Sequence, residues 1–400
     1  MLQIAAIFRR EYGRTVAVLT RFLGDISSAE EAVQEAFAVA LAKWPETGIP
    51  PSPVGWLITT ARNKALDRLR KEAIASERQY AVQLLNDVEQ AEEHDVDDDH
   101  LRLIFTCCHP ALAPDAQVAL TLRLIGGLST EEIAHAFLLQ TATLAQRISR
   151  AKAKIRDANI PYRVPETEEL PARMGAVLAV VYLIFNEGYS TSSGGELLRT
   201  ELCDEAIRLG RLLVTLIPQE SEVLGLLALM LLIDARRDAR SAGGHLVLLS
   251  EQDRALWDDS KIDEGRALLR TCLTRNRPGP YQLQAAINAV HTEAPSAGRP
   301  DWQQILELYD QLMAIAPSAV VALNRAVAVA EVHGVERALQ LVDAIDLPKY
   351  HLRHAIRADL LRRIGRTADA SSAYRAALEC CENETEREFL LRQCQSLTKH

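Results

Sequence analysis

The sequence of 400 residues lacks the motifs by which most enzymes, membrane proteins and secreted proteins are recognised. No P-loop, nucleotide-binding glycine pattern, G-x-S-x-G or H-E-x-x-H motif occurs, and residues 172–300 hold no nucleophile–base pattern. Apolar runs such as residues 223–233 are too short to span a bilayer. Arg9, Arg10 and Glu11 interrupt the segment where a secretory signal would be apolar. We therefore expect a cytoplasmic protein that is not an enzyme and has no membrane partner.

Aromatic residues and regularly spaced cysteines are also scarce. Phe, Trp and Tyr make up 5% of the chain, whereas Ala, Leu and Arg are abundant, which favours helices over strands. The seven cysteines form no C-x-x-C motif and no disulfide-scaffold spacing, so reduced thiols are expected. The composition predicts an all-α protein that is long enough for two or three domains.

The formal net charge of -9 conceals strong local contrasts. Residues 62–71 and 147–156 are basic, whereas residues 87–99 include a run of carboxylates. Because salt screens charges beyond about 8 Å, such local patches decide what the chain attracts. The two basic stretches are therefore candidate nucleic-acid contacts, although a solvated basic face is the alternative for each.

Four segments follow from the pattern of apolar residues and breaks. Residues 1–75 and 100–160 are predicted to form two small helical units, and residues 76–99 form a polar, acidic linker between them. Prolines and glutamates separate the second unit from residues 171–400, which are predicted to be helical throughout.

The last hundred residues of the chain look repetitive. Small and large apolar residues alternate at helical spacing, and the breaks fall at Gly or Pro. Gly334 and Gly365 lie one helical hairpin apart, near the period of tetratricopeptide-like pairs. The C-terminal segment is thus predicted to be helical-repeat-like toward its end.

The segment from Ser129 to Arg156 has the pattern of a helix-turn-helix. S-T-E-E is a capping sequence for a first helix, and a second, basic helix follows after a short turn. On this second helix the spacing predicts a buried side of Leu144, Ile148, Ala151 and Ile155. The opposite side then presents hydroxyl, amide and guanidinium groups, the types that contact base edges and phosphates.

Three motifs in this order resemble the extracytoplasmic-function sigma factors of bacterial RNA polymerase. The polymerase-clamp helix of that family is similar to S-A-E-E-A-V-Q-E-A-F at residues 28–37. The helix that recognises and melts the −10 element resembles V-G-W-L-I-T-T-A-R-N-K-A-L-D-R-L-R-K at residues 54–71. The −35 recognition unit resembles G-L-S-T-E-E-I-A-H-A-F, followed by R-I-S-R-A-K-A-K-I-R, within residues 127–156. The resemblance covers residues 1 to about 158.

Two further segments, F-T-C-C-H-P-A-L at residues 105–112 and Y-L-I-F-N-E-G-Y at residues 182–189, resemble the subgroup with a long tetratricopeptide-like C-terminal extension. The resemblance implies a fold of two sigma domains, the second a helix-turn-helix, joined by the acidic linker and followed by that extension. It implies that core RNA polymerase, through its clamp and flap, and promoter DNA are the partners. It also implies that the extension modulates activity and that a dedicated anti-sigma factor is doubtful. The length of the extension and its amphipathic helices further suggest a contact with the sigma domains inside the chain.

The resemblance assigns three sets of side chains. The polymerase-binding set is Glu30, Glu31, Gln34 and Glu35. The set for the −10 element is Trp56, Arg62, Asn63, Lys64, Arg68 and Arg70. The set for the −35 element is Thr143, Gln146, Arg147, Arg150 and Lys154. For Trp56, a buried core position is favoured over stacking on a base. Because residues 138–141 lack the usual turn glycine and Ala145 stands where a basic residue is common, no −35 sequence is predicted.

Other interpretations stay open at this point. A helix-turn-helix regulator independent of the polymerase clamp would need residues 100–158 alone, and an interaction scaffold would rest on the helical repeats. The extension could be a protein-binding or a small-ligand sensor. No cofactor or metal is predicted: Cys107, Cys108 and His109 are consecutive and more suited to packing than to zinc. Gly188 is predicted to cap a helix end in the left-handed conformation, with ligand binding as the alternative.

Overall fold

The structure is a computed structural model that describes residues 2–76, 96–137, 139–190, 198–293 and 300–397. Helices dominate these residues, and the strands among them are one two-residue pair, β1 (Ser241–Ala242) and β2 (His245–Leu246). The predicted all-α class is therefore confirmed. The chain divides into two compact units, Met1–Leu183 and Ile184–His400, and the division falls within helix α9 (Leu170–Tyr189).

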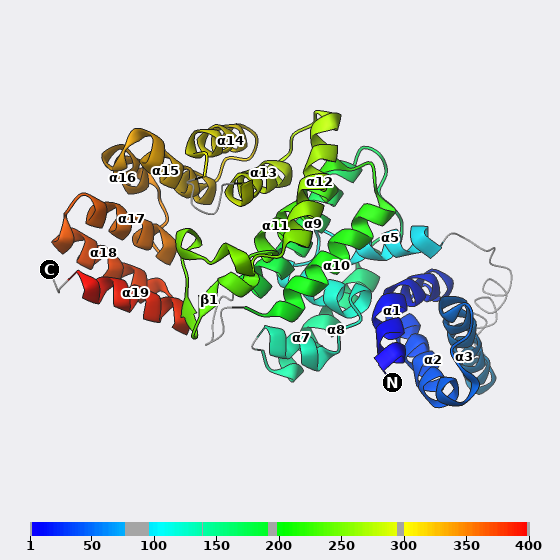
Figure 1. The fold of residues 1–400 in the computed structure, drawn as a ribbon. Helices are drawn as coiled ribbons and strands as arrows, with labels where there is room; N and C mark the ends of the chain where they lie inside the picture. Colours follow the sequence, from blue (N-terminus) through cyan, green and yellow to red (C-terminus); the bar gives the residue numbers. More distant parts are fainter. Residues whose placement is uncertain (1, 77–95, 138, 191–197, 294–299, 398–400) are drawn as a thin grey trace. The chain divides into compact units, whose positions relative to one another are not determined.

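Among its described residues, the first unit contains eight helices before α9, most of which are labelled in Figure 1. They are α1 (Leu2–Leu23), α2 (Ile26–Thr47), α3 (Pro53–Ser76), α5 (Val96–Cys107), α6 (Pro114–Leu120), the π-helix η1 (Thr121–Ile125), α7 (Thr130–Ala136) and α8 (Thr141–Asp157). Helix α1 packs against α2, α3, α5 and η1, whereas α8 packs against α6 and α7. The two predicted small helical parts thus lie in one compact unit, and their separate domain boundaries stay a prediction.

The sequence predicts a helix capped by Ser27 or Ser28 and ended by Trp44-Pro45, with an inward stripe of Ala29, Val33, Phe37, Ala40 and Leu41. Helix α2 differs from this prediction at both ends and at one position of the stripe. Asp25 is the N-cap, and its carboxylate accepts a hydrogen bond of 2.7 Å from the backbone N–H of Ser28. The helix continues through Pro45, although Trp44-Pro45 looked like its end, and stops at Gly48, whose φ is 82°. Leu41, expected to face inward, is 53% exposed because one residue turns a helix by about 100° from the buried Ala40.

The helix-turn-helix elements form as predicted within the described residues. Ser129 and Glu132 make a capping box, with bonds of 3.1 Å and 2.7 Å in opposite directions. The expected inner side of α8 is buried at every position, from Leu144 to Ile155. One residue of the turn, number 138, lies outside the described residues. The π-helix η1, which the sequence did not predict, precedes this motif and carries Arg123.

The N-terminal helices are joined to the helix-turn-helix part by buried polar contacts. Asp99 is fully buried and accepts a hydrogen bond of 2.8 Å from Arg21. The hydroxyl of Tyr162 donates to the carbonyl oxygens of Ala17 at 2.7 Å and Asp99 at 3.1 Å. Most of the predicted acidic linker, residues 77–95, lies outside the described residues. Its last residues belong to α5 and to this packed contact.

The second unit is a succession of helices. They are α10 (Thr200–Leu216), α11 (Ser221–Asp234), α12 (Asp259–Arg275), α13 (Pro280–Glu293), α14 (Trp302–Ile315), α15 (Ala319–His333), α16 (Val335–Ala344), α17 (His351–Arg363), α18 (Thr367–Cys380) and α19 (Glu384–Ser396). Short 3-10 turns, η2 (Arg237–Ala239), η3 (Leu249–Glu251) and η4 (Arg254–Leu256), surround the strand pair.

Each helix from α10 to α19 packs against the next one in the chain, as Figure 1 shows in the change from green to red. One apolar core runs from Leu283 to Leu390 and serves α13 to α19 together. Gly334 and Gly365 have φ values of 98° and 76°, which suits the breaks predicted there. Neighbour-to-neighbour packing is the arrangement of helical repeats. The tetratricopeptide-like assignment stays a prediction.

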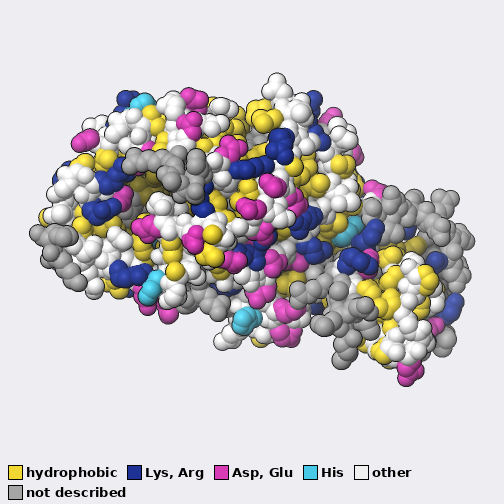
Figure 2. Space-filling view, in the orientation of Figure 1, with side chains coloured by type: hydrophobic (Ala, Val, Ile, Leu, Met, Phe, Trp, Pro, Cys, Tyr) yellow, Lys and Arg dark blue, Asp and Glu magenta, His cyan; other side chains and the backbone are white. Residues whose placement is uncertain are grey.

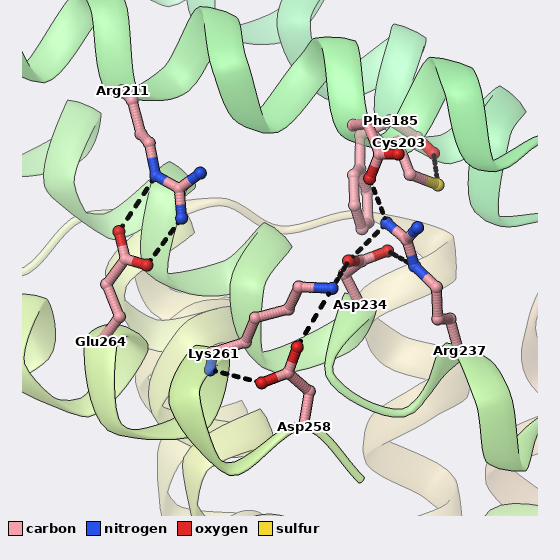
Figure 3. A network of polar contacts seen from close by, with 9 residues as sticks. Phe185, Cys203, Arg211, Asp234, Arg237, Asp258, Lys261 and Glu264 are labelled. Carbon is pink, nitrogen blue, oxygen red and sulfur yellow. Dashed lines mark hydrogen bonds and ion pairs between the residues drawn. The ribbon is translucent and has the colours of Figure 1, made fainter. Parts of the chain in front are cut away.

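A polar network ties α10, α11 and α12 together (Figure 3). Asp234, fully buried at the end of α11, pairs with Arg237 at 2.6 Å and Lys261 at 2.8 Å. Asp204 and Asp258 supply a second carboxylate to each of these cations. Since burying a carboxylate is costly unless it is paired, these contacts fix how the three helices meet.

Gly188 has another role than the predicted helix cap. Helix α9 continues to Tyr189, so Gly188 is an interior helical residue without positive φ. A Cβ at this position would lie 2.7 Å from the backbone nitrogen of Cys203 in α10. Glycine is therefore present because the start of α10 approaches α9 too closely for a side chain. The neighbouring Glu187 pairs with Arg199 at 2.6 Å, which holds that approach.

Candidate nucleic-acid and protein interface

The outer side of α8 presents the residues predicted for the −35 element. Four of them, Thr143, Gln146, Arg150 and Lys154, are exposed. The fifth, Arg147, keeps 32% of its side-chain surface and pairs with Asp115 of α6 at 3.3 Å. Because the opposite side of α8 is buried, this row of amide and cationic groups is held on a fixed support. It can offer hydrogen bonds to bases and charge to phosphates.

The residues predicted for the −10 element lie along α3. Asn63, Lys64 and Arg70 are exposed. Arg62 is half-buried, with its guanidinium 5.2 Å from the centre of the Phe22 ring. Trp56 is also half-buried and meets Trp44 edge to face at 5.3 Å. Trp56 thus packs against Trp44 and keeps part of its surface exposed.

Arg68, the remaining member of that set, is engaged with the predicted polymerase-binding set. Its guanidinium donates to the carboxylates of Glu31 and, at 2.7 Å, Glu35, both on α2. Glu31 and Glu35 keep 62% and 42% of their side-chain surface. This exposed fork links α2 to α3, and it brings residues predicted to bind different partners into direct contact.

Glu30 differs from its neighbours on α2 because its carboxylate is buried, with 6% of the residue exposed. It accepts hydrogen bonds from Tyr12 at 3.1 Å, Arg123 at 2.6 Å and Gln34 at 3.2 Å, and it also pairs with Lys152 of α8. Glu30, although predicted to bind polymerase, is therefore already paired with residues of η1 and α8 in the same unit.

The charge state of Glu30 follows from these partners. Burial by itself raises the pKa of a carboxyl group, but Lys152 and Arg123 outweigh burial and hold the pKa of Glu30 below its ordinary value. Burial, followed by the Glu30 charge, raises the pKa of Tyr12 far above its ordinary value, so this hydroxyl remains a donor. Glu30 is thus an anion at neutral pH, neutralised by two cations whose side chains are 15% and 16% exposed.

A groove of about 440 Å³ separates α2 from the helix-turn-helix part. Its α2 wall includes Ser27, Glu30, Glu31 and Gln34, and α8 supplies most of the other wall. Three of the four predicted polymerase-binding residues therefore line a space within the first unit. Of the four, Glu31 and Gln34 are exposed, Glu35 is partly exposed and Glu30 is buried.

The sequence did not point to Tyr12, Arg123 and Lys152 as partners of Glu30. They lie 18, 93 and 122 residues away in the chain. Lys152 follows the buried Ala151 and sits at the border between the two sides of α8, which is the one sequence signal for an unusual position. Helical spacing predicts which side of a helix is buried, but it does not say which distant residue will meet it.

Cys107 and Cys108 take the packing role that was preferred over zinc binding. Both are buried, and the Cys108 thiol lies 3.5 Å from the hydroxyl of Thr121. Burial raises the pKa of the Cys108 thiol to about 11, so it stays protonated at neutral pH. The ring of His109 accepts a hydrogen bond of 3.1 Å from the backbone N–H of Ala111, and the three side chains do not converge among the described residues.

Two further features are the distribution of surface charge and the apolar helix α9. On the face drawn in Figure 2, basic and acidic side chains are interspersed. Among the described helices, Leu170–Tyr189 is long and apolar enough to cross a membrane by length and composition alone. Of its apolar window, 39% is buried, including positions from Met174 to Phe185.

Comparison with known families assigns three parts of the chain. Residues 7–74 match sigma-70 region 2, residues 102–155 match sigma-70 region 4, and residues 173–273 match a family of unknown function (DUF6596). The α2–α3 carboxylate and cation groups thus fall in the first match, and α8 falls in the second.

Curated relatives agree with this division. The uncharacterized protein R00370 of Rhizobium meliloti (strain 1021) is 42% identical over 398 residues, which cover 96% of this chain and 93% of that protein. The probable ECF RNA polymerase sigma factor SigI of Mycobacterium tuberculosis (strain CDC 1551 / Oshkosh) is 30% identical over 164 residues, covering 39% of this chain and 56% of that protein. The ECF RNA polymerase sigma factor SigK of Mycobacterium sp. (strain KMS) is 28% identical over 153 residues, covering 36% and 76%.

Proposed function

The chain belongs to the extracytoplasmic-function sigma factors of RNA polymerase that carry a long helical C-terminal extension, and from this premise we propose how its parts divide the work. We propose that α2 binds the polymerase clamp, that α3 recognises and opens the −10 element, and that α8 recognises the −35 element with the helix-turn-helix docked on the flap. The observation that carries the proposal is the exposed cationic row on α8, supported by a buried opposite side. The protein would act in the cytoplasm and would have no enzymatic activity.

The residues on α8 divide by the kind of contact they can make. Gln146 and Arg150 carry the amide and guanidinium groups that recognise base edges, each worth about 1–3 kcal/mol of discrimination. Lys154, nearer the end of the helix, suits a phosphate. The logarithm of the affinity falls linearly with the logarithm of the salt concentration, and losing one phosphate contact makes this dependence shallower by about 0.9 in slope. Affinity and salt dependence therefore test the two kinds of contact separately.

The direct test is transcription by core RNA polymerase with this protein on fragmented genomic DNA, with new start sites mapped. We expect discrete starts that share −35 and −10 elements. An Arg150→Ala/Lys154→Ala double variant should lose them. The matched control is Arg375→Ala/Arg392→Ala, which removes the same charge from exposed positions of the extension. Binding to DNA without binding to core polymerase would overturn the proposal in favour of a conventional helix-turn-helix regulator.

For the extension, we propose that it modulates promoter activity through contacts with the sigma domains, without a dedicated anti-sigma factor. Its truncation should change promoter activity in vivo. A cut after Ala158 would also remove Tyr162 and Arg173, whose hydrogen bonds to Ala17, Asp99 and Phe105 belong to the first unit. A cut after Ser190 keeps them.

The two truncations separate modulation from damage to the first unit. A change in promoter activity after the cut at Ser190 supports modulation by the extension. A change that occurs only after the cut at Ala158, together with faster hydrogen exchange in α1 and α5, would refute it and leave a structural role for residues 159–190.

A further inference from the structure

Three side chains of metal-binding types converge near the C-terminal end of the extension. His351 is the first residue of α17, Cys381 follows the last residue of α18, and Glu386 lies in the first turn of α19. Their ligand atoms all lie within 4.8 Å of one another. None of them belongs to the sigma domains, so the cluster is unrelated to the promoter and polymerase contacts proposed above.

The separations suit one shared cation. Nε2 of His351 lies 3.0 Å from the Glu386 carboxylate, and the Cys381 sulfur lies 3.9 Å from the same oxygen. Tetrahedral zinc, with bonds of about 2.0–2.3 Å, needs ligand atoms roughly 3.3–3.5 Å apart. The two Glu386 distances are therefore within about half an ångström of what zinc requires, and the His351 nitrogen and the Cys381 sulfur lie within 4.8 Å of each other.

The orientation of the histidine argues against a simple ion pair. Nε2 of His351 is buried and has no hydrogen-bond partner, although the Glu386 oxygen is close. The ring nitrogen therefore does not point along the line to that oxygen, as it would in a His–Glu hydrogen bond. A buried imidazole nitrogen without a hydrogen-bond partner, close to a carboxylate oxygen and a thiol, is available to bind a cation.

The surrounding backbone holds the ligands in place. Asn383 caps α19 by accepting hydrogen bonds of 3.1 Å from the N–H groups of Thr385 and Glu386. Arg387 donates to the carbonyl oxygens of Leu378 and, at 2.9 Å, Cys381, which fixes the end of α18. These contacts fix the backbone segments that carry Cys381 and Glu386.

We propose that His351, Cys381 and Glu386 form a binding site for a divalent cation of the zinc class. Sulfur, imidazole and carboxylate ligands together suit zinc rather than calcium or magnesium. The thiolate and the carboxylate balance the two positive charges, and the thiol proton passes to solvent on binding. Cys381 is 3% exposed, whereas the His351 and Glu386 side chains keep 23% and 15% of their surface, so a fourth ligand such as water can enter from that side.

The consequence is a metal-dependent junction of three helix ends. An ion held by the start of α17, the end of α18 and the start of α19 stabilises their relative positions. Hydrogen exchange in these helices should slow when zinc is added. The sigma domains of the same chain should exchange at unchanged rates.

The experiment titrates the full chain, first dialysed against a chelator, with Co²⁺ as a spectroscopic probe and then with Zn²⁺ as a competitor. We expect one Co²⁺ per chain, with a thiolate-to-cobalt charge-transfer band that Zn²⁺ abolishes. Cys381→Ala should remove the band. His351→Gln and Glu386→Gln should weaken binding by about 100-fold or more, since even supporting residues cost 10- to 100-fold.

Two matched controls use the same residue types nearby. His354→Gln lies one turn further along α17, where the ring contacts the Pro348 carbonyl at 2.8 Å, and Cys394→Ser changes a thiol beside Ser371. Both should bind as the parent chain does. Absence of the band in the parent chain, or an equal band in Cys381→Ala, overturns the proposal. If Cys381→Ala does not fold, the partly exposed His351→Gln variant decides the matter, with circular dichroism as the check of folding.

Discussion

The contact between Glu30 and Lys152 allows a quantitative test of how the two halves of the first unit are held together. Glu30→Gln keeps the size of the side chain but removes its charge. Lys152 and Arg123 then lose the carboxylate that neutralises them, and water cannot replace it well because their side chains are only 15% and 16% exposed. Lys152→Met removes one cation and keeps the alkyl chain. The double variant completes a cycle that isolates the interaction between the two residues.

The magnitude follows from burial. Breaking a buried ion pair by removing one partner costs about 3–5 kcal/mol, because the other charge remains in a poorly solvated place. Glu30→Gln still accepts hydrogen bonds from Tyr12 and Arg123, so we expect about 3 kcal/mol. Lys152→Met leaves Glu30 paired with Arg123, so about 1–2 kcal/mol is expected. The coupling energy should be about 1–2 kcal/mol.

The assay is hydrogen exchange of the full chain, because a protein with two compact units does not unfold in one step. Amides of α8 should exchange faster in both single variants. The control Lys154→Met removes an exposed lysine two residues further along the same helix, and it should change the local free energy by less than about 0.5 kcal/mol. Unchanged exchange in α8 of Glu30→Gln, or a coupling energy near zero, would refute this account.

The same variants test whether the contact competes with polymerase. Glu30 is predicted to meet the clamp, yet in this structure it is buried against α8. Lys152→Met should therefore increase the affinity for core polymerase, by roughly 5- to 30-fold for a contact of one to two kcal/mol. An unchanged affinity would mean that polymerase binds without opening the contact.

Three other outcomes are expected. The stability that the Glu30 contact provides should be complete above the ordinary carboxyl pKa of 4.5, and it should be lost as pH falls through the lowered pKa of Glu30. Hydrogen-exchange rates, corrected for the pH dependence of the exchange chemistry, should show this loss in the parent chain but not in Glu30→Gln. Burial, together with two arginines, lowers the pKa of His291 from 6.5 to about 4. As pH falls from about 6.5 to about 4, hydrogen exchange in the extension should therefore report a loss of about 3 kcal/mol of stability, which His291→Gln should lack. Gly188→Ala should destabilise by about 1–3 kcal/mol in the same assay because its Cβ meets the Cys203 backbone, whereas Gly175→Ala, with open space around it, should be tolerated.

Much of the fold of the first unit could be predicted because helical spacing and capping are local properties. The buried side of α8 and the Ser129 capping box followed from residue types a few positions apart. The prediction that Leu41 faces inward was wrong because Leu41 lies next to the buried stripe and not on it. The stripe continues at Trp44. The predicted end of α2 at Pro45 was wrong because packing keeps the helix intact beyond this proline.

The polar contacts could not be predicted in the same way. Glu30 was selected because it matches a polymerase-facing motif, but its surroundings depend on residues up to 122 positions away. The three residues of the proposed metal site, His351, Cys381 and Glu386, likewise come from different helical segments. Their spacing in the sequence does not predict that they lie together. Gly188 shows the reverse case, since a residue that resembles a cap serves close packing of two helices. Tertiary contacts, and not local preferences, decide these positions.

The fork in which Arg68 joins Glu31 and Glu35 links two binding events. Arg68 is predicted to touch promoter DNA, and the two carboxylates are predicted to touch polymerase. A phosphate that takes the guanidinium would free both carboxylates, and a basic polymerase surface that takes the carboxylates would free the guanidinium. Polymerase and promoter would then strengthen each other's binding by the same factor, as thermodynamic linkage requires. A free sigma factor would have low affinity for either partner alone, and its affinity for both would rise when they are present together.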